Sequence, residues 1–313
     1  MTVDQLLDHV IKIGSDGLNE EFKQIRLKPI LDSYDVFKEK ENIQKNRYRD
    51  VFCLDKSRVK LRVNDLYKNN NYIHANYVDG YKQKNAYIST QGPLYETVKD
   101  FWSMVWQETT LVIAMTTKVI EQKKLKCYQY WPLEKGESMQ IENLFEIENE
   151  EVYDLNDYRV TKLIIKNLNN NKSRKIVHCQ FLSWPDHGVP NTSLQILEFI
   201  EMVRKYQQEK LDELPEKWTE HPSGPPICVH CSAGIGRTGT FLAIDISVNK
   251  LKDCKKVDIE ETVNKIRLQR AQSVQMRDQY VFCYMAVLEY AKREKLFLKH
   301  SFLDLESIFK KLF

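Results

Sequence analysis

The stretch from residue 227 to residue 248 constrains the fold of this chain more than any other. It joins an apolar run to a buried helix through a loop of small residues. Residues 227–229 read Ile-Cys-Val, a β-prone run that follows two prolines. Residues 241–248 read Phe-Leu-Ala-Ile-Asp-Ile-Ser-Val, which predicts a buried helix. The loop between them, residues 230–239, reads His-Cys-Ser-Ala-Gly-Ile-Gly-Arg-Thr-Gly. A strand that turns directly into a helix predicts an α/β fold, with the helix N-terminus directed into the loop.

This loop is typical of an anion site. The backbone N–H groups of a glycine-rich turn converge on one point, and the dipole of the next helix adds positive charge there. Arg237 adds a planar cation that can bind two phosphate oxygens at once. The same field stabilises a thiolate at Cys231, which predicts a nucleophile at the base of a phosphate cradle. The alternative for Cys231 is a small buried hydrophobe at a strand end. The glycines, His230 and Thr238 around it favour the chemical interpretation.

The loop resembles the signature loop of the protein tyrosine phosphatase family, the tyrosine-specific cysteine phosphatases, here of the non-receptor type. The resemblance extends from about residue 20 to residue 295, in the family's order. Lys45 to Asp50 resembles the phosphotyrosine-recognition loop, and Gln275 to Gln279 resembles the glutamine loop. The segment from Trp184 to Pro190 resembles the mobile acid loop, with Trp184 as a supporting residue. Core segments of the family are matched at residues 76–80, 91–94 and 100–102.

The resemblance implies a catalytic role for six residues. Cys231 attacks phosphorus and forms a cysteinyl-phosphate intermediate, which divides one difficult displacement into two easier ones. Asp186 protonates the leaving tyrosine oxygen and then takes a proton from water. Gln275, and less directly Gln279, positions that water. Thr238 donates its hydroxyl to the thiolate, and His230 orients the loop. The phosphate oxygens are held by the Arg237 side chain and by the N–H groups of Ser232, Ala233, Gly234, Ile235, Gly236 and Arg237.

Tyr48 is the candidate selector of substrate. An aromatic wall beside the cradle makes a narrow slot that a flat phosphotyrosine ring enters, and phosphoserine is too short to reach its base. A core tyrosine is the alternative, but the polar neighbours Arg47, Arg49 and Asp50 indicate a surface position. The resemblance implies that Asp50 pairs with substrate backbone N–H groups and that Arg49 favours acidic flanking residues.

Several of these residues also have an ordinary structural interpretation. The resemblance matches Glu121 to the acid that orients the signature arginine, and Lys126 to a basic residue near the closed acid loop. Both are otherwise solvated charges in a charged run. Asp186 taken alone is a turn residue, and Gln275 taken alone is a surface polar residue. Met276 stands where the family usually has threonine.

Composition excludes several classes of protein. The chain of 313 residues is 42% hydrophobic and 29% charged, which is typical of a globular protein with a substantial core. A net charge of +3 argues against nucleic-acid partners. No apolar stretch approaches about 20 residues, so no integral membrane segment is expected. Seven scattered cysteines and a lone C-x-x-C favour neither a disulfide framework nor a zinc site. We therefore expect a monomeric, cytoplasmic protein in reducing surroundings, without a metal or a cofactor.

The predicted architecture is a single α/β domain over residues 1–313. We expect a central, highly twisted mixed β-sheet flanked by α-helices, with the signature loop at a strand-to-helix turn. N-terminal helices are expected over residues 1–27, a catalytic core over about 28–297, and a tail packed on the domain over 298–313. Residues 207–226 read as a surface excursion. Further expected elements are a central strand at 111–115, a hairpin of strands at 158–166 and 175–181, and helices at 194–203, 258–270 and 278–292.

The sequence thus predicts a protein tyrosine phosphatase that acts on phosphotyrosine-containing proteins, with an implied role in tyrosine-kinase signalling. One alternative is a broader phosphatase of phosphoserine, phosphothreonine or phosphoinositides. Another is a non-catalytic phosphotyrosine binder. The Tyr48 and Trp184 segments weigh against the first, and the presence of Cys231, Arg237 and Asp186 weighs against the second.

Overall fold

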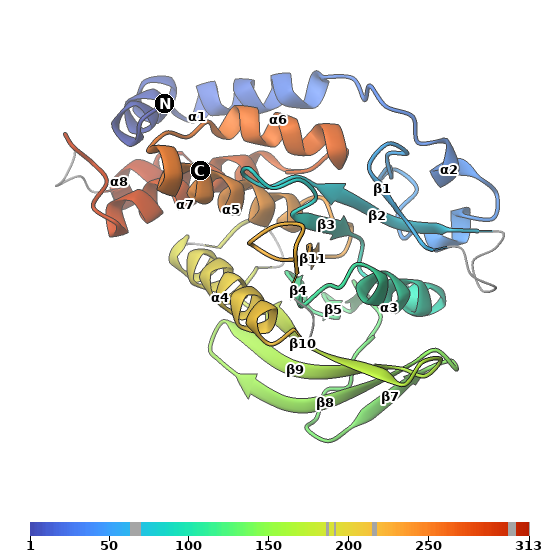
Figure 1. Ribbon diagram of the computed structural model, residues 1–313. Coiled ribbons are helices and arrows are strands. Elements are labelled where there is room, and N and C mark those ends of the chain that lie inside the picture. The colour runs from blue at the N-terminus through green and yellow to red at the C-terminus, as the bar shows by residue number, and fades with distance from the viewer. Residues whose placement is uncertain (63–69, 186–187, 191, 215–217, 300–304, 313) are drawn as a thin grey trace.

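The computed structural model describes residues 1–62, 70–185, 188–190, 192–214, 218–299 and 305–312. Within them the centre is a mixed nine-stranded sheet of order β1-β2-β3-β11-β4-β10-β9-β8-β7 (Figure 1). Its strands are β1 (Arg58–Lys60), β2 (Tyr72–Val78), β3 (Tyr87–Thr90), β4 (Val112–Met115), β7 (Ser138–Ile141), β8 (Phe145–Asp154), β9 (Tyr158–Asn167), β10 (Lys172–Phe181) and β11 (Ile227–His230). A separate hairpin pairs β5 (Ile120–Glu121) with β6 (Lys124–Leu125).

Helices pack on both faces of this sheet, which confirms the predicted α/β class. The described helices are α1 (Val3–Leu27), α2 (Asp35–Lys38), α3 (Val98–Gln107), α4 (Leu194–Asp212), α5 (Arg237–Cys254), α6 (Ile259–Gln269), α7 (Arg277–Arg293) and α8 (Leu305–Lys310). Two short 3₁₀ turns are η1 (Ile43–Lys45) and η2 (Tyr95–Thr97). The predicted central strand, hairpin strands and helices are therefore confirmed, with small changes of their ends. No helix among the described residues has the length and apolar character that crossing a membrane requires.

The four inner strands are parallel, and this fact positions the site. β11 runs parallel to both β3 and β4, and β10 runs parallel to β4. Parallel strands place their carboxyl ends at one edge of the sheet, where α/β proteins bind ligands. The segments that follow these strands, residues 91–94, 116–121, 182–185 and 231–236, therefore meet at that edge.

Alternate residues of the inner strands face two different cores. Ala114 and Val229 pack toward α4, α5, α6 and α7. Ile113 and Cys228 pack on the opposite face, toward α3. This period of two explains why the inner strands read as continuous apolar runs, because both of their faces are buried.

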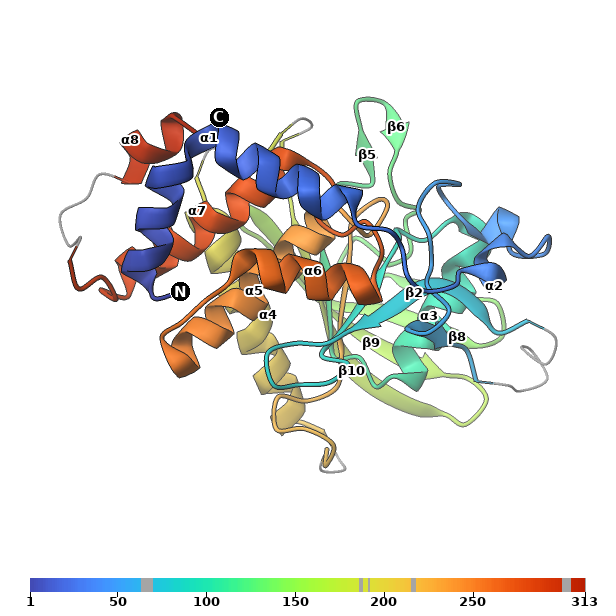
Figure 2. The same ribbon diagram turned by 90° about the horizontal axis from the view of Figure 1, so that it is seen from above.

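The two ends of the chain pack on the same helical layer. Thr2 and Gln5 form a capping box at the start of α1. Gly14, at φ 57°, kinks α1 into two parts that correspond to the two predicted N-terminal helices (Figure 2). Arg277, at the start of α7, donates to Ser15 Oγ at 2.6 Å and to the carbonyl of Leu312.

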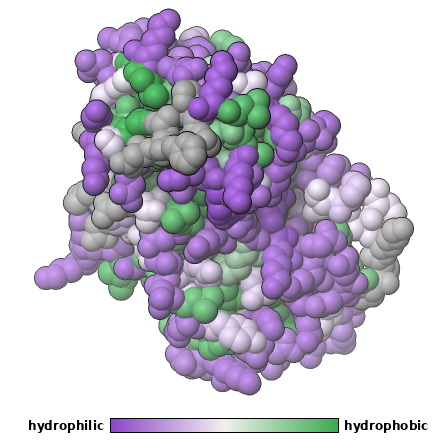
Figure 3. All heavy atoms as spheres, turned by 90° about the vertical axis from the view of Figure 1, so that its left-hand side faces the viewer, coloured by the Kyte–Doolittle hydropathy of each residue, from purple (hydrophilic) through white to green (hydrophobic). Residues whose placement is uncertain are grey.

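The tail covers part of this layer, as predicted. Leu305, Phe309 and Leu312 are buried in the main core. Residues 300–304 and 313 lie outside the described part, so the prediction is confirmed for residues 305–312 only. The face that carries α8 and the start of α1 is mainly hydrophilic, with small scattered hydrophobic areas (Figure 3).

The predicted surface excursion at residues 207–226 was wrong in its first part. α4 continues to Asp212, and both Gln207 and Lys210 are buried. The Gln207 amide donates to the carbonyls of Ser223 and Pro225 at 3.3 and 2.8 Å. A polar side chain is buried without a large penalty when its hydrogen bonds are satisfied, and polarity alone does not reveal such partners.

Candidate active site

The signature loop follows β11 and ends in the first turn of α5. Gly234, at φ +70°, adopts the left-handed conformation that glycine tolerates best. A Cβ atom at this position would lie 2.0 Å from the carbonyl oxygen of Thr90 on the parallel strand β3. The Ser232 carbonyl accepts a hydrogen bond from Gly92 N–H at 2.9 Å. The loop is therefore seated tightly on the segments that follow the neighbouring strand.

Cys231 lies at the base of this loop. Its side chain is 5% exposed, and its Sγ accepts a hydrogen bond from Gly234 N–H at 3.2 Å. Arg270 lies behind the loop and donates to the carbonyls of Ala233 and Gly234, both at 3.0 Å. Because a trans peptide directs its N–H away from its carbonyl, these bonds turn the Gly234 and Ile235 N–H groups toward the loop interior. The sequence predicts an amide nest of this kind, and its binding of phosphate stays a prediction.

Arg270 is a positioning residue that sequence reasoning missed. It is 0% exposed and also donates to Asn76 Oδ1 at 2.8 Å and to His74 Nδ1 at 3.1 Å. Its sequence position at the end of a predicted helix is typical of an ordinary helix-ending cation, so no local signal distinguishes it. Only the packing of α6 behind the loop brings its guanidinium to the loop carbonyls.

Replacement of Arg270 by methionine is expected to lower both stability and turnover. The change leaves the Ala233 carbonyl and the Asn76 oxygen buried without a donor, at about 1–3 kcal/mol for each unsatisfied group, while the Gly234 carbonyl keeps only the Ser89 hydroxyl. We expect the free energy of unfolding in urea to fall by about 3 kcal/mol or more. Arg267→Met is the matched control, because Arg267, one turn earlier, donates to Ser273 O and to no other described residue. Equal unfolding midpoints and equal turnover for the two variants would contradict this role.

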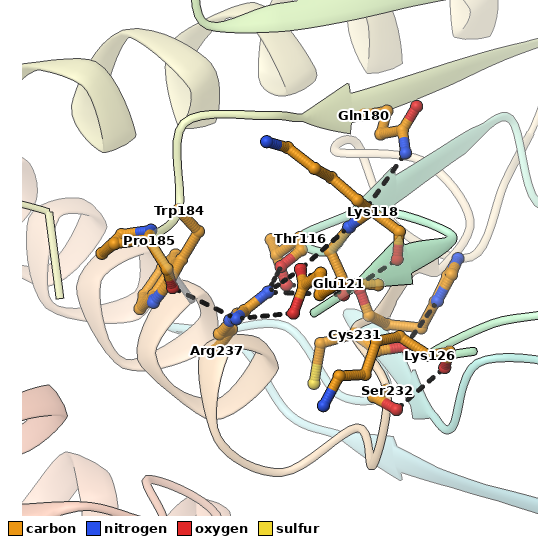
Figure 4. Close-up of polar contacts among 12 residues, drawn as sticks. Thr116, Lys118, Glu121, Lys126, Gln180, Trp184, Pro185, Cys231, Ser232 and Arg237 are labelled. Atoms are coloured by element: carbon orange, nitrogen blue, oxygen red, sulfur yellow. Dashed lines mark hydrogen bonds and ion pairs between the residues drawn. The ribbon is translucent and has the colours of Figure 1, made fainter. Parts of the chain in front are cut away.

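Arg237 is held in place before any phosphate binds. Its guanidinium donates to both carboxylate oxygens of Glu121, at 2.6 and 3.0 Å (Figure 4). Burial raises the pKa of Glu121, but the hydrogen bonds and charge of Arg237 outweigh it and keep the pKa below its usual value. Arg237 also donates to Thr116 O and Pro185 O, each at 3.3 Å. Glu121 thus contacts the signature arginine, and its role in orienting that arginine for catalysis stays a prediction.

The acid loop begins next to this arginine. The Trp184 ring centre lies 5.8 Å from the Arg237 guanidinium carbon, and the Trp184 side chain is 4% exposed. Trp184 Nε1 donates to Gly188 O at 3.2 Å, which links the two ends of the loop. Asp186 itself lies outside the described residues. Its predicted role therefore stays a prediction.

His230 is a buried neutral residue behind the nucleophile. Burial lowers the pKa of His230 to about 4. Its Nδ1 lies 3.1 Å from the Cys231 carbonyl oxygen and therefore donates to it. Its Nε2 is then an acceptor for the Tyr130 hydroxyl at 2.7 Å, and Tyr130 in turn lies 2.7 Å from His178 Nε2. The sequence analysis missed the roles of Tyr130 and His178. They lie 48 residues from each other, and Tyr130 lies 100 residues from His230, so no local pattern links the three side chains.

The recognition segment reaches the other side of the loop. The Tyr48 hydroxyl lies 2.8 Å from Ser232 Oγ, which also donates to the carbonyl of Lys126 at 2.8 Å. Tyr48 is half-buried, and Arg49 and Asp50 are exposed. The surface position predicted for this segment is therefore confirmed. The structure brings Tyr48, Ser232 and Lys126 together beside Cys231.

The glutamine loop lies over the signature loop. A Cβ atom on Gly236 would lie within 3.3 Å of the side-chain oxygens of both Gln275 and Gln279, so both amides are close to the loop. Gln279 Oε1 accepts the N–H groups of Gln275 and Met276, at 3.0 and 3.1 Å. Met276 is 56% exposed, and its backbone rather than its side chain joins this contact. The methionine therefore does not displace either glutamine.

Thr238 and Ile235 complete the site. The Thr238 hydroxyl is buried and makes no hydrogen bond with any residue in the described part of the chain. Ile235 is 1% exposed, and its carbonyl accepts Val274 N–H at 2.9 Å, which ties the signature loop to the glutamine loop. Among the described residues, no group of three His, Cys, Asp or Glu side chains is arranged to hold a metal ion.

The arrangement of Cys231, the loop amides and Arg237 can bind a tetrahedral dianion above the sulfur. Comparison with known proteins identifies the family that the sequence resembles. The family model described as Protein-tyrosine phosphatase matches residues 42–289. Tyrosine-protein phosphatase non-receptor type 9 of Rattus norvegicus is 44% identical over 294 residues, which cover 94% of this chain and 49% of that protein. Receptor-type tyrosine-protein phosphatase eta of Mus musculus is 38% identical over 279 residues, 89% of this chain and 21% of that protein.

A third relative, receptor-type tyrosine-protein phosphatase alpha of Homo sapiens, is 36% identical over 297 residues, 93% of this chain and 35% of that protein. The chain therefore spans about half the length of the non-receptor relative and less of the receptor-type ones. The family match covers both the signature loop and the segments that the parallel strands bring to it. This chain belongs to the protein tyrosine phosphatase family.

Proposed function

We propose that this chain hydrolyses phosphotyrosine in proteins through a cysteinyl-phosphate intermediate, the protein-tyrosine-phosphatase reaction (EC 3.1.3.48). One observation carries the proposal. Cys231 Sγ accepts the Gly234 N–H inside a loop whose Ala233 and Gly234 carbonyls bond outward to Arg270. N–H groups that converge on a sulfur favour its anion, and the same groups can then hold phosphate oxygens.

The first step transfers the phosphoryl group to the enzyme. The Cys231 thiolate attacks phosphorus, an S–P bond forms, and the bond from phosphorus to the tyrosine oxygen breaks. Asp186 gives its proton to that oxygen, so that a neutral phenol leaves. Arg237, already aligned by Glu121, shares two equatorial oxygens with the loop amides and stabilises the charge that develops on them.

The second step releases phosphate. Water attacks phosphorus, the S–P bond breaks, and Asp186 takes the proton from water. Gln275 and Gln279 lie beside Gly236 and are placed to orient that water. A buried Thr238 hydroxyl without another described partner can donate to the departing thiolate. This chemistry needs an unoxidised sulfur, and we therefore place the reaction in the reducing cytoplasm.

Tyrosine selectivity follows from the depth of the site. Tyr48 is tied to Ser232 at the rim, while Cys231 is almost fully buried at the base. A phosphoserine side chain would not span that depth. The test compares phosphate release from one peptide synthesised with phosphotyrosine or with phosphoserine, and from a phosphoinositide. Equal or faster release from phosphoserine or phosphoinositide would reject tyrosine selectivity and favour the broader phosphatase.

Asp186→Ala is expected to lower kcat by about 10²- to 10³-fold while keeping affinity for phosphotyrosine peptide. The reason is that Asp186 acts on the leaving oxygen and adds little to ground-state binding. Steady-state kinetics and equilibrium binding of the same peptide measure the two effects. A variant that binds the peptide much more weakly than the wild type would speak against the assignment. The trapped complex would also identify substrate proteins from cell extracts.

A further inference from the structure

A cationic hairpin stands beside the catalytic loop. Residues 118–126, called here the lysine hairpin, contain β5 and β6 and carry four lysines, Lys118, Lys123, Lys124 and Lys126. The same nine residues contain one acid, Glu121, in a chain whose net charge is only +3. Figure 2 shows β5 and β6 projecting from the body of the molecule. The charge of this segment is therefore local and concentrated.

Three sets of hydrogen bonds hold the lysine hairpin against the catalytic loop and the recognition segment. Glu121 holds the signature arginine through two hydrogen bonds. The Lys126 carbonyl accepts from Ser232 Oγ at 2.8 Å, and the Leu125 carbonyl accepts from Arg47 of the recognition segment at 3.4 Å. Figure 4 shows Lys118, Glu121 and Lys126 around the loop that holds Cys231. The hairpin thus stands at a set position relative to the phosphate cradle.

The register of the hairpin places a lysine on its catalytic face. Glu121 pairs directly with Lys124, and Ile120 pairs with Leu125. Side chains of directly paired residues share one face of an antiparallel hairpin. Lys124 therefore stands on the face from which Glu121 reaches Arg237. Since Arg237 neutralises Glu121, that acid does not cancel the charge of Lys124.

These lysines have no anionic partner in the part of the chain that the structure describes. Among the described residues none of the four takes part in an ion pair, and Lys118, Lys123 and Lys124 are exposed. Ile120 and Leu125, on the opposite face, are 60% and 54% exposed. An uncompensated cationic face beside a site for a dianion attracts substrates that carry further negative charge.

The turn at the tip of the hairpin has a lysine at a position where glycine is the favoured residue. Gln122 and Lys123 both have left-handed backbone, with φ of 49° and 60°. Two-residue turns with both residues left-handed favour Asn-Gly or Asp-Gly sequences. Lys82, Lys255 and Lys295 share this left-handed conformation, so the turn fixes only the position of Lys123 at the tip of the hairpin.

We propose that Lys123 and Lys124 bind acidic side chains that flank the phosphotyrosine of the substrate. The occupant is an acidic segment of the substrate protein, recognised through its carboxylates. The proposal rests on the function proposed above and adds a second cationic contact, on the hairpin whose Leu125 carbonyl accepts from Arg47 of the recognition segment. It makes these two lysines specificity-determining residues, with no part in the chemical steps.

The test measures kcat/KM for three phosphotyrosine peptides and for p-nitrophenyl phosphate. The peptides have neutral flanks, acidic residues before the phosphotyrosine, or acidic residues after it. The variant is Lys123→Gln with Lys124→Gln. The matched control, Lys255→Gln with Lys256→Gln, removes the same charge just beyond the far end of α5, about 27 Å along the helix from Arg237. Each protein is assayed at low and at physiological salt.

We expect the wild type to hydrolyse at least one acidic peptide about fivefold faster than the neutral one at low salt. The K123Q/K124Q variant loses this preference, the control keeps it, and added salt weakens it. Turnover of p-nitrophenyl phosphate stays within about twofold in all proteins, because that substrate has no flanks.

Two results would overturn the proposal. The first is an acidic preference that survives unchanged in K123Q/K124Q. The second is a wild-type protein with no acidic preference at low salt. In either case, loss of sedimentation of the variant with vesicles of phosphatidylcholine and phosphatidylserine would assign the hairpin to a lipid surface. A wild-type protein without turnover of any phosphotyrosine substrate would instead defeat the proposed function itself.

Discussion

Cys231→Ser is expected to lower kcat for p-nitrophenyl phosphate by about 10⁴-fold or more. A serine hydroxyl is far less acidic than a thiol, so the amide nest around Gly234 does not ionise it at neutral pH. A phosphoserine intermediate would also hydrolyse slowly, because an alkoxide is a poor leaving group. The backbone N–H groups remain, and we therefore expect the variant to bind phosphotyrosine peptide with nearly unchanged affinity. Stopped assays and equilibrium binding measure the two effects separately.

Cys228→Ser is the matched control for this substitution. Cys228 lies three residues earlier on β11, is fully buried, and faces the α3 side of the sheet. Burial raises the pKa of the Cys228 thiol, since no donor near it favours the anion. We expect the control to lose stability but to keep turnover. Equal turnover by the wild type and Cys231→Ser would end the proposed cysteinyl-phosphate mechanism, and an absence of turnover in both would leave only binding as the function.

Arg237→Lys is expected to reduce kcat by about 10³-fold, the lower end of what a transition-state arginine contributes to phosphoryl transfer. The two terminal nitrogens of the guanidinium hold the two Glu121 oxygens, and its Nε–H has no acceptor among the described residues. A lysine ammonium is a single point donor and cannot hold a carboxylate and two phosphate oxygens in one plane. The charge is kept, so the loss measures the geometry of the arginine. Single-turnover kinetics on p-nitrophenyl phosphate give the rate of the first step.

Arg204→Lys separates this effect from the general cost of breaking a buried ion pair. Arg204 binds Asp245 from a position on α4, and its contacts include the hydroxyl of Tyr87 and none of the loop residues. We expect Arg204→Lys to lower the unfolding midpoint while turnover changes by less than about tenfold. If Arg237→Lys lost no more activity than Arg204→Lys, the role of Arg237 as the phosphate clamp would be wrong.

The local parts of the site were predictable because their residues are adjacent in the sequence. The strand, the turn and the helix at residues 227–248 follow from apolar runs on either side of small residues. The left-handed Gly234 and the helix N-terminus at Arg237 belong to the same short segment. The Thr2 capping box and the buried strand at β4 were predictable for the same reason. The motifs of the recognition, acid and glutamine loops were identified through their resemblance to the family.

The convergence of these parts was decided by the tertiary structure. The contact between Arg237 and Glu121 spans 116 residues, and that between Arg270 and the Gly234 carbonyl spans 36. Tyr130 reaches His230 across 100 residues. No local pattern encodes such pairs, because each depends on which parallel strands become neighbours and which carboxyl ends meet.

The lysine hairpin shows the same division between sequence and tertiary structure. The sequence by itself determined that residues 118–126 are basic. The pairing of Lys124 with Glu121, and therefore the face on which Lys124 stands, follows only from the register of β5 and β6. Sequence determined the candidate nucleophile, the candidate phosphate cradle and the charge of this protein, since these depend on residue type and local backbone. The tertiary structure decided which groups surround the sulfur, because that depends on long-range strand order and the burial it imposes.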